Sequence, residues 1–276
     1  MADDPPASRQ EPPDPDPAPG FAAPMTPEPG PPAPVAPPRP WGPWATAGWT
    51  AFVVAAMQAV QAAVLIGFAV VQLARDPKAD LPALLPALGA DGTFLGVATL
   101  ASTPAVVALV ALLAHLRLPI GDYLALRGTS ARRAALAAAG MVAFLAASDG
   151  LTHALGRPLV PPSMAEIYRS ASLPPLLVAL LICAPLGEEL LIRGFLYRGL
   201  ADSRLGPGIA IGLTALAWAL MHVQYDLYGI ATVYLMGLYL GVVRHLTGSL
   251  PMTILLHVLA NAVATAEAAA TVGRGG

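Results

Sequence analysis

The dominant pattern in this chain is a series of long apolar runs separated by short polar segments. The longest, from Trp41 to Ala74, contains no Asp, Glu, Lys or Arg, and three tryptophans lie near its start. About 20 apolar residues suffice for a helix to cross a bilayer, and tryptophan concentrates where a helix meets the membrane surface. The pattern predicts six to eight membrane-crossing helices, seven by our count, at residues 45–74, 92–116, 131–155, 173–200, 208–223, 227–243 and 251–270.

The first 40 residues have a different composition, because they hold 16 of the 30 prolines. Such a segment buries too little apolar surface to offset the entropy lost on ordering. We expect a disordered Pro-rich tail over residues 1–40, solvated rather than bound to a partner that reads extended proline segments. N-terminal transmembrane helices should occupy residues 41–171, ending in a loop with a short surface helix at 156–171. A second group of helices, which carries the candidate chemistry, should occupy residues 172–270.

Composition excludes most soluble classes of protein. Hydrophobic residues make up 56% of the chain and charged residues 12%, the latter about half the usual share in a soluble domain. A core of about 235 residues cannot hide so much apolar surface, so the fold class we predict is an all-α polytopic membrane helix bundle. The net charge of −2 and the lack of a Lys/Arg cluster argue against a nucleic-acid partner. The single cysteine, Cys183, excludes an internal disulfide and a cysteine-based zinc site.

Basic residues in alternate loops predict an orientation. With the N-terminus inside, eight Lys or Arg residues fall in inner segments and five in outer ones. This excess favours a cytoplasmic N-terminus. The inner set is Arg39, Arg117, Arg127, Arg132, Arg133, Arg198, Arg204 and Arg244, and the outer set is Arg75, Lys78, Arg157, Arg169 and Arg274.

The first candidate for chemistry is a group of charges inside the fourth predicted helix. Each ionisable group there costs about 2.5–3.5 kcal/mol to insert, so such groups mark functional positions. Glu189 and Arg193 are four residues apart and can pair on one helix face. Glu188 lies about 100° away around the helix and is not neutralised by that pair, which suits a general base. The alternative is a helix end at which both acids are solvated.

Two further motifs place polar groups on later helices. Trp218-x-x-x-His222 ends the fifth predicted helix, and His257-x-x-x-Asn261 lies on the last one. Separately, they could be a satisfied core histidine and an interhelical hydrogen-bonded pair. Together with Glu188 they supply a base, two imidazoles and an amide, which can activate water and stabilise an oxyanion. Glu188, His222 and His257 could also hold one divalent metal with an open position for water.

The order of these motifs resembles the CPBP intramembrane proteases, which are CAAX-processing and bacteriocin-processing proteins related to the type II CAAX prenyl endopeptidase. The resemblance covers roughly residues 173–265. The segment Gly248-Ser249-Leu250-Pro251 also fits the family. One departure is Trp218, where the family usually has Phe. The three motifs read Glu188-Glu189-x-x-x-Arg193, Trp218-x-x-x-His222 and His257-x-x-x-Asn261.

The resemblance implies roles for single residues. Glu188 and His222 would activate the hydrolytic water, while His257 and Asn261 would bind the oxyanion or a metal. Glu189 would hold Arg193 as structural support. Two classes of protease stay open. One is a metalloprotease, with zinc as the first choice of ion at Glu188, His222 and His257, and the other is a glutamate-dependent protease. The HExxH metal motif is absent from the sequence.

We therefore predict an intramembrane endopeptidase of the CAAX-processing type. Its expected partners are the lipid bilayer and a membrane-attached protein or peptide substrate. Richness in Ala, Pro and Arg favours a bacterial cell membrane as its location. The alternative is a non-catalytic scaffold or bacteriocin-immunity protein of the same fold, which has no need of all four polar residues. A transporter using them as a proton relay is disfavoured because no repeated half is visible.

Overall fold

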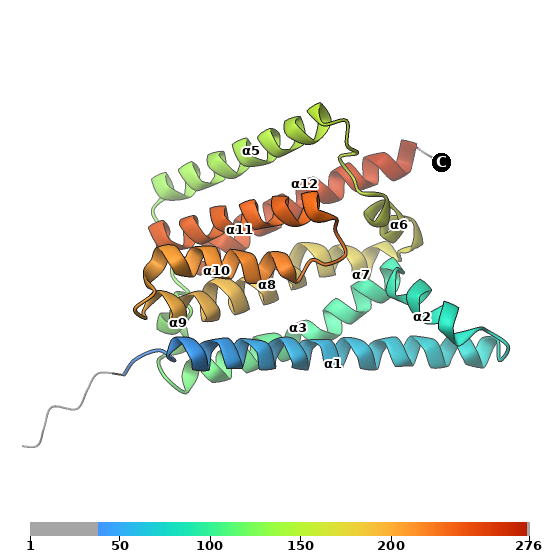
Figure 1. Cartoon of the computed structure of the whole chain (residues 1–276), viewed down its shortest axis with the longest axis horizontal. Coiled ribbons are helices and arrows are strands. Elements are labelled where there is room, and N and C mark those ends of the chain that lie inside the picture. The colour runs from blue at the N-terminus through green and yellow to red at the C-terminus, as the bar shows by residue number, and fades with distance from the viewer. Residues whose placement is uncertain (1–37, 275–276) are drawn as a thin grey trace, which may run out of the picture. The chain divides into compact units, whose positions relative to one another are not determined.

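The computed structural model describes residues 38–274 (Figure 1). The predicted tail therefore lies outside the described residues except for its last three positions. From Pro38 onward the chain forms one compact unit, and within the described range every regular element is helical. The all-α class is confirmed.

Within residues 38–274, six helices are long and apolar enough to cross a membrane. The seventh predicted span is present as α10, Gly206–Leu220, but it has only 15 residues. The count therefore falls within the predicted range, and the integral membrane class is confirmed. The six long helices are α1 (Pro43–Arg75), α3 (Gly92–His115), α5 (Ala131–Ala154), the continuous helix Leu173–Ala201, α11 (Leu227–Thr247) and α12 (Leu250–Arg274).

Three short helices connect the spans. α6, Pro162–Ser170, is the surface helix expected in the 156–171 loop. α2, Leu81–Gly89, is a helix that the hydropathy pattern did not predict. A proline in the first turn of a helix costs no backbone hydrogen bond, so it is compatible with this start. α4, Ile120–Tyr123, is a single turn.

The helix Leu173–Ala201, termed the motif helix below, is not uniformly α-helical. It consists of α7 (Leu173–Val178), α8 (Ala184–Glu189) and α9 (Tyr197–Ala201), joined by the π-helical segments η1 (Ala179–Cys183) and η2 (Leu190–Leu196). A π-helical segment widens the turn and is frequent at functional sites. Here the two segments lie on either side of the adjacent acids of α8.

Each π segment accepts a hydrogen bond from a side chain of another helix. The Asn261 amide Nδ2 donates to the Leu180 carbonyl in η1 at 2.7 Å. The Arg244 Nε donates to the Arg193 carbonyl in η2 at 3.1 Å. These bonds satisfy carbonyls within the membrane bundle, where an unpaired one would be costly.

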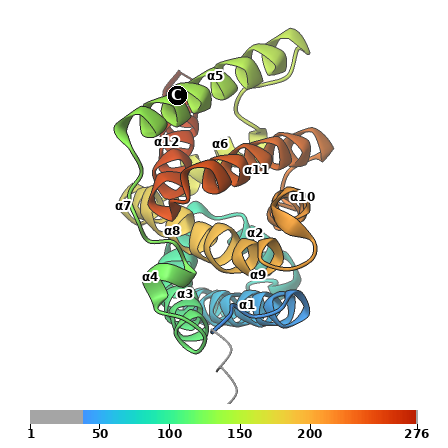
Figure 2. The same ribbon diagram turned by 90° about the vertical axis from the view of Figure 1, so that its left-hand side faces the viewer.

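The helices of both predicted groups share one hydrophobic core. α1 and α3 lie on one side and α5 on the other, with the motif helix, α10, α11 and α12 between them (Figures 1 and 2). Val53 of α1, Val106 of α3, Phe195 of η2 and Leu256 of α12 are buried in this core. The division at residues 171/172 thus rests on which segment carries the motifs, and it stays a prediction.

A turn between α11 and α12 is fixed by glycine. Gly248 ends α11 with φ of +64°, a left-handed conformation that favours glycine. Its carbonyl accepts from Arg127 Nε at 2.9 Å, and Ser249 Oγ donates to the Arg127 carbonyl at 2.6 Å. This turn therefore holds the segment between α4 and α5 beside the start of α12.

Close packing at Gly96 gives a first testable prediction. A Cβ at Gly96 would lie 2.8 Å from the Leu176 nitrogen and 2.9 Å from the Pro175 carbonyl carbon, which are backbone atoms that cannot rotate away. Gly96→Ala should therefore destabilise the protein by about 1–3 kcal/mol. Gly67→Ala is the matched control, since nothing lies within 4 Å of its Cβ position and alanine favours a helix. The melting temperature in detergent should fall for Gly96→Ala only; equal melting of the two variants would contradict this packing.

Candidate active site

Glu189 and Arg193 form a fully enclosed ion pair within the motif helix. Arg193 Nη1 donates to Glu189 Oε1 at 2.7 Å, and both side chains have 0% exposure. The pairing expected from their spacing is thus present. Arg193 also donates from Nη2 to the Gly237 carbonyl of α11 at 3.3 Å, and its Cζ lies 4.4 Å from the centroid of the Trp218 ring. These contacts compensate for the removal of the guanidinium from water.

The same Glu189 carboxylate binds His257. The two groups are 3.0 Å apart, His257 Nδ1 to Glu189 Oε1, and His257 is buried on α12. Since a carboxylate only accepts, Nδ1 carries the proton and donates. Glu189 therefore joins α8, η2 and α12 and fixes the orientation of the His257 ring.

Glu188 has a different environment from its neighbour. It is half-buried, and its Oε2 accepts a hydrogen bond from Trp218 Nε1 at 2.5 Å. Within residues 38–274 no Lys, Arg or His forms an ion pair with Glu188, whereas Glu189 has both Arg193 and His257. Glu189 is thus buried and paired with a cation, whereas Glu188 is fixed by a hydrogen bond without a paired cation in the described structure.

The two histidines border the same indole ring. His222 lies edge to face with Trp218 at 5.1 Å between ring centroids, and His257 does so at 5.2 Å. His222 Nδ1 lies 2.9 Å from the Trp218 carbonyl. Because a carbonyl only accepts, this Nδ1 donates, and Nε2 of the neutral ring is free to accept.

The turn after α10 carries a tyrosine that contacts the site. Tyr225 stacks on His222 with 6.0 Å between centroids and an interplanar angle of 11°. Burial, together with the nearby Glu188 carboxylate, raises the pKa of Tyr225. Its hydroxyl therefore stays protonated at neutral pH and adds no negative charge beside Glu188.

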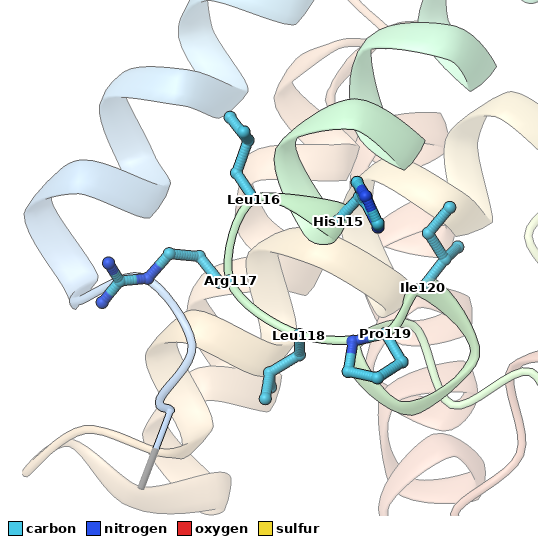
Figure 3. Close-up of a pocket in the computed structure, with 6 residues that line it drawn as sticks. All are labelled: His115, Leu116, Arg117, Leu118, Pro119 and Ile120. Carbon is cyan, nitrogen blue, oxygen red and sulfur yellow. The ribbon is translucent and has the colours of Figure 1, made fainter. Parts of the chain in front are cut away.

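The candidate residues are thus divided between two places. Glu188, His222 and His257 all contact Trp218. Asn261 instead directs one N–H of its amide at the Leu180 carbonyl. The open depression in Figure 3 lies where α3 meets α4, and none of the candidate residues lines it. From the motifs we also predict that Glu188, His222, His257 and Asn261 converge on one water-accessible cavity, and this stays a prediction.

A metal centre can be compared with the donor set in the structure. Within the described part of the chain, no three His, Cys, Asp or Glu side chains gather closely enough to hold an ion. Glu188 Oε2 accepts the indole N–H, and Oε1 is left for another partner. The metal site at Glu188, His222 and His257 stays a prediction.

Three residues of the site, Trp218, Tyr225 and Arg244, have contacts that the sequence motifs did not predict. For Trp218 a signal was present, because a tryptophan in place of Phe adds an N–H donor. Arg244 was assigned to a loop after residue 243, but α11 continues to Thr247 and Arg244 is buried with 4% exposure. Gly248 was the available signal, because glycine commonly follows the last residue of a helix.

A buried ion pair, two histidines and an unneutralised carboxylate among apolar helices define an integral membrane protein with a polar site inside the bundle. Residues 170–263 match the family model Rce1-like, described as type II CAAX prenyl endopeptidase Rce1-like. The matched segment contains all three motifs, which confirms the family resemblance. Over this segment, about a third of the chain, the protein is similar to proteases of the CAAX type. No curated protein and no solved structure matches the chain.

Proposed function

We propose that this protein is an intramembrane endopeptidase in which Glu188 acts as general base on water. The observation that carries the proposal is the contrast between the adjacent acids. Arg193 and His257 neutralise Glu189, whereas Glu188 accepts only the Trp218 N–H and keeps its second oxygen for another partner. An ionised carboxylate without a cationic partner, in an apolar setting, is a suitable proton acceptor.

The proposed reaction begins with a water between Glu188 Oε1 and His222 Nε2. Glu188 takes one proton as the water oxygen adds to the scissile carbonyl carbon, and the carbonyl oxygen becomes an oxyanion. We assign its stabilisation to His257, which Glu189 holds in place through Nδ1. When the C–N bond breaks, the leaving nitrogen takes the proton from Glu188, and the carboxylate is regenerated.

The divalent ion stays a prediction from the sequence, and the steps above do not depend on it. A zinc ion would polarise the water and the scissile carbonyl. Metal analysis of the purified protein, with cleavage assays after chelation and after readdition of zinc, tests this directly. One bound zinc per chain together with reversible loss of activity would support the metalloprotease class, and full activity without zinc would support the glutamate-dependent one.

The location in a bacterial cell membrane is also a proposal, as is the cytoplasmic N-terminus. When α10 is counted with the six long helices, successive spans run in alternate directions (Figure 1), which agrees with the loop assignment used to count basic residues. Two hydrogen bonds join segments that this assignment places on the inner side. Arg117 donates to the Arg39 carbonyl, and Arg127 donates to the Gly248 carbonyl. The excess of basic residues in this set supports the orientation.

Two peptide probes test the activity. One carries a farnesylated cysteine followed by three residues, and the other carries an acylated cysteine in the same sequence; both have a fluorescent group that cleavage releases. We expect the protein purified in detergent to cleave at least one of them. Failure to cleave either would contradict the proposed hydrolase and favour the non-catalytic scaffold.

The contact of Asn261 predicts a loss of stability on substitution. In Asn261→Leu the Leu180 carbonyl of η1 loses its donor, which should cost about 1–3 kcal/mol for a buried group. The melting temperature in detergent should therefore fall. A variant with unchanged melting but much slower cleavage would instead favour the oxyanion role that the family resemblance implies.

A further inference from the structure

Trp218 contacts every charged or titratable side chain at the centre of the site except Glu189. Its side chain is 1% exposed. The indole N–H donates to Glu188, the ring face covers the Arg193 guanidinium, and both histidine rings lie edge to face with the indole. Trp218 lies on α10, one turn before His222, and its contacts place it between the motif helix and α12.

The indole contacts both Glu188 and Arg193. Its N–H binds Glu188 Oε2, which fixes one oxygen of a side chain with three rotatable bonds. Its face covers the Arg193 guanidinium, with 4.4 Å between Cζ and the ring centroid. Within the described residues, Glu188 Oε1 receives no hydrogen bond and is not an enclosed unpaired atom.

A phenyl ring could provide only one of these contacts. Phenylalanine would cover Arg193 and contact both histidines, but it has no N–H. The hydrogen bond to Glu188 is therefore specific to the tryptophan of this chain. Hydrogen bonds to a charged acceptor are stronger than those between neutral groups and fix direction.

We propose that Trp218 is the positioning residue for Glu188: its N–H orients the carboxylate so that Oε1 is presented to the reacting water. This inference rests on the proposed function, since it assigns a geometric task within the same reaction. The other titratable groups around Glu188 are Arg193, His222, His257 and Tyr225, and none of them donates a hydrogen bond to its carboxylate in the described structure.

The test compares Trp218→Phe with Trp41→Phe. Trp41 is a matched control far along the chain from the motifs. Its N–H also donates a hydrogen bond, in this case to the Leu113 carbonyl at 2.9 Å, and Arg117 lies over its ring at 4.8 Å. With the peptide that the unsubstituted protein cleaves, we expect kcat to fall by about 10-fold or more in Trp218→Phe. KM should stay within about twofold, since the lost bond acts on the water and not on peptide binding. Trp41→Phe should keep the original kcat.

The outcomes separate positioning from folding. Suppose that Glu188→Gln is inactive but Trp218→Phe keeps the kcat of the unsubstituted protein. This result would overturn the positioning role and leave the proposed function intact. An active Glu188→Gln would overturn the proposed function itself. If Trp218→Phe melts well below Trp41→Phe, the test uses a variant with benzothienylalanine at position 218 instead. This residue keeps the indole shape without the N–H. A kcat unchanged by that residue would also overturn the proposal, and a lowered kcat at normal melting would support it.

Discussion

Glu188→Gln should lower the rate of peptide cleavage by about 10²-fold or more while leaving the fold intact. Glutamine has nearly the same size and its amide oxygen can still accept the Trp218 N–H, but it cannot take a proton from water. Stability should hardly change, because Glu188 has no ion pair to lose in the described structure. The measurement is cleavage of the lipidated peptide probe, with melting in detergent recorded on the same preparation.

A surface carboxylate provides the control. Glu166 on α6 forms an exposed pair with Arg169 at 2.8 Å, and Glu166→Gln should change neither cleavage nor melting by a measurable amount. A fully active Glu188→Gln would remove the general-base assignment, and with it the main support for hydrolysis by this site.

Glu189→Ala should have the opposite signature, a loss of folding stability. It leaves Arg193 with 0% exposure and no carboxylate partner, and breaking a buried pair in this way costs about 3–5 kcal/mol. His257 also loses the acceptor of its Nδ1 proton. Yield, melting temperature and cleavage should therefore fall together, in contrast to Glu188→Gln.

A second substitution distinguishes the lost charge pair from general damage. In Glu189→Ala combined with Arg193→Leu, no unpaired charge is left in the core, so the melting temperature should recover relative to the single variant. Activity need not recover, because His257 still lacks its partner. A single Glu189→Ala variant as stable as the original protein would refute the structural role of this pair.

The transmembrane helices were predictable because hydropathy and length determine them almost directly. Their ends were less so. α10 stops at Leu220 instead of 223, and α11 continues to Thr247 instead of 243. The π-helical segments could not be predicted, since carbonyls in each are satisfied by donors, Asn261 and Arg244, that arrive from distant helices.

The site was predictable where it depends on one helix alone. The Glu189–Arg193 pair follows from their four-residue spacing. Which carboxylate His257 would bind was not predictable, because adjacent acids point about 100° apart and the packing of α12 selects between them. The structure selects Glu189. The hydrogen bond from the Trp218 N–H to Glu188 was not predictable for the same reason, since the direction of an indole N–H depends on tertiary packing.

The shortness of α10 makes the surrounding lipid a variable of the site. At 15 residues it spans about 22 Å, against about 30 Å for the hydrocarbon layer. Its outer stripe, which includes Ile209, Leu213, Leu216 and Leu220, is exposed, so the acyl chains beside it must meet this shorter apolar length. Such hydrophobic mismatch thins the bilayer locally and draws headgroups and water toward the end of α10, where His222 lies. Shorter acyl chains match α10 without this deformation, so we expect the thickness of the host membrane to change how easily water reaches His222.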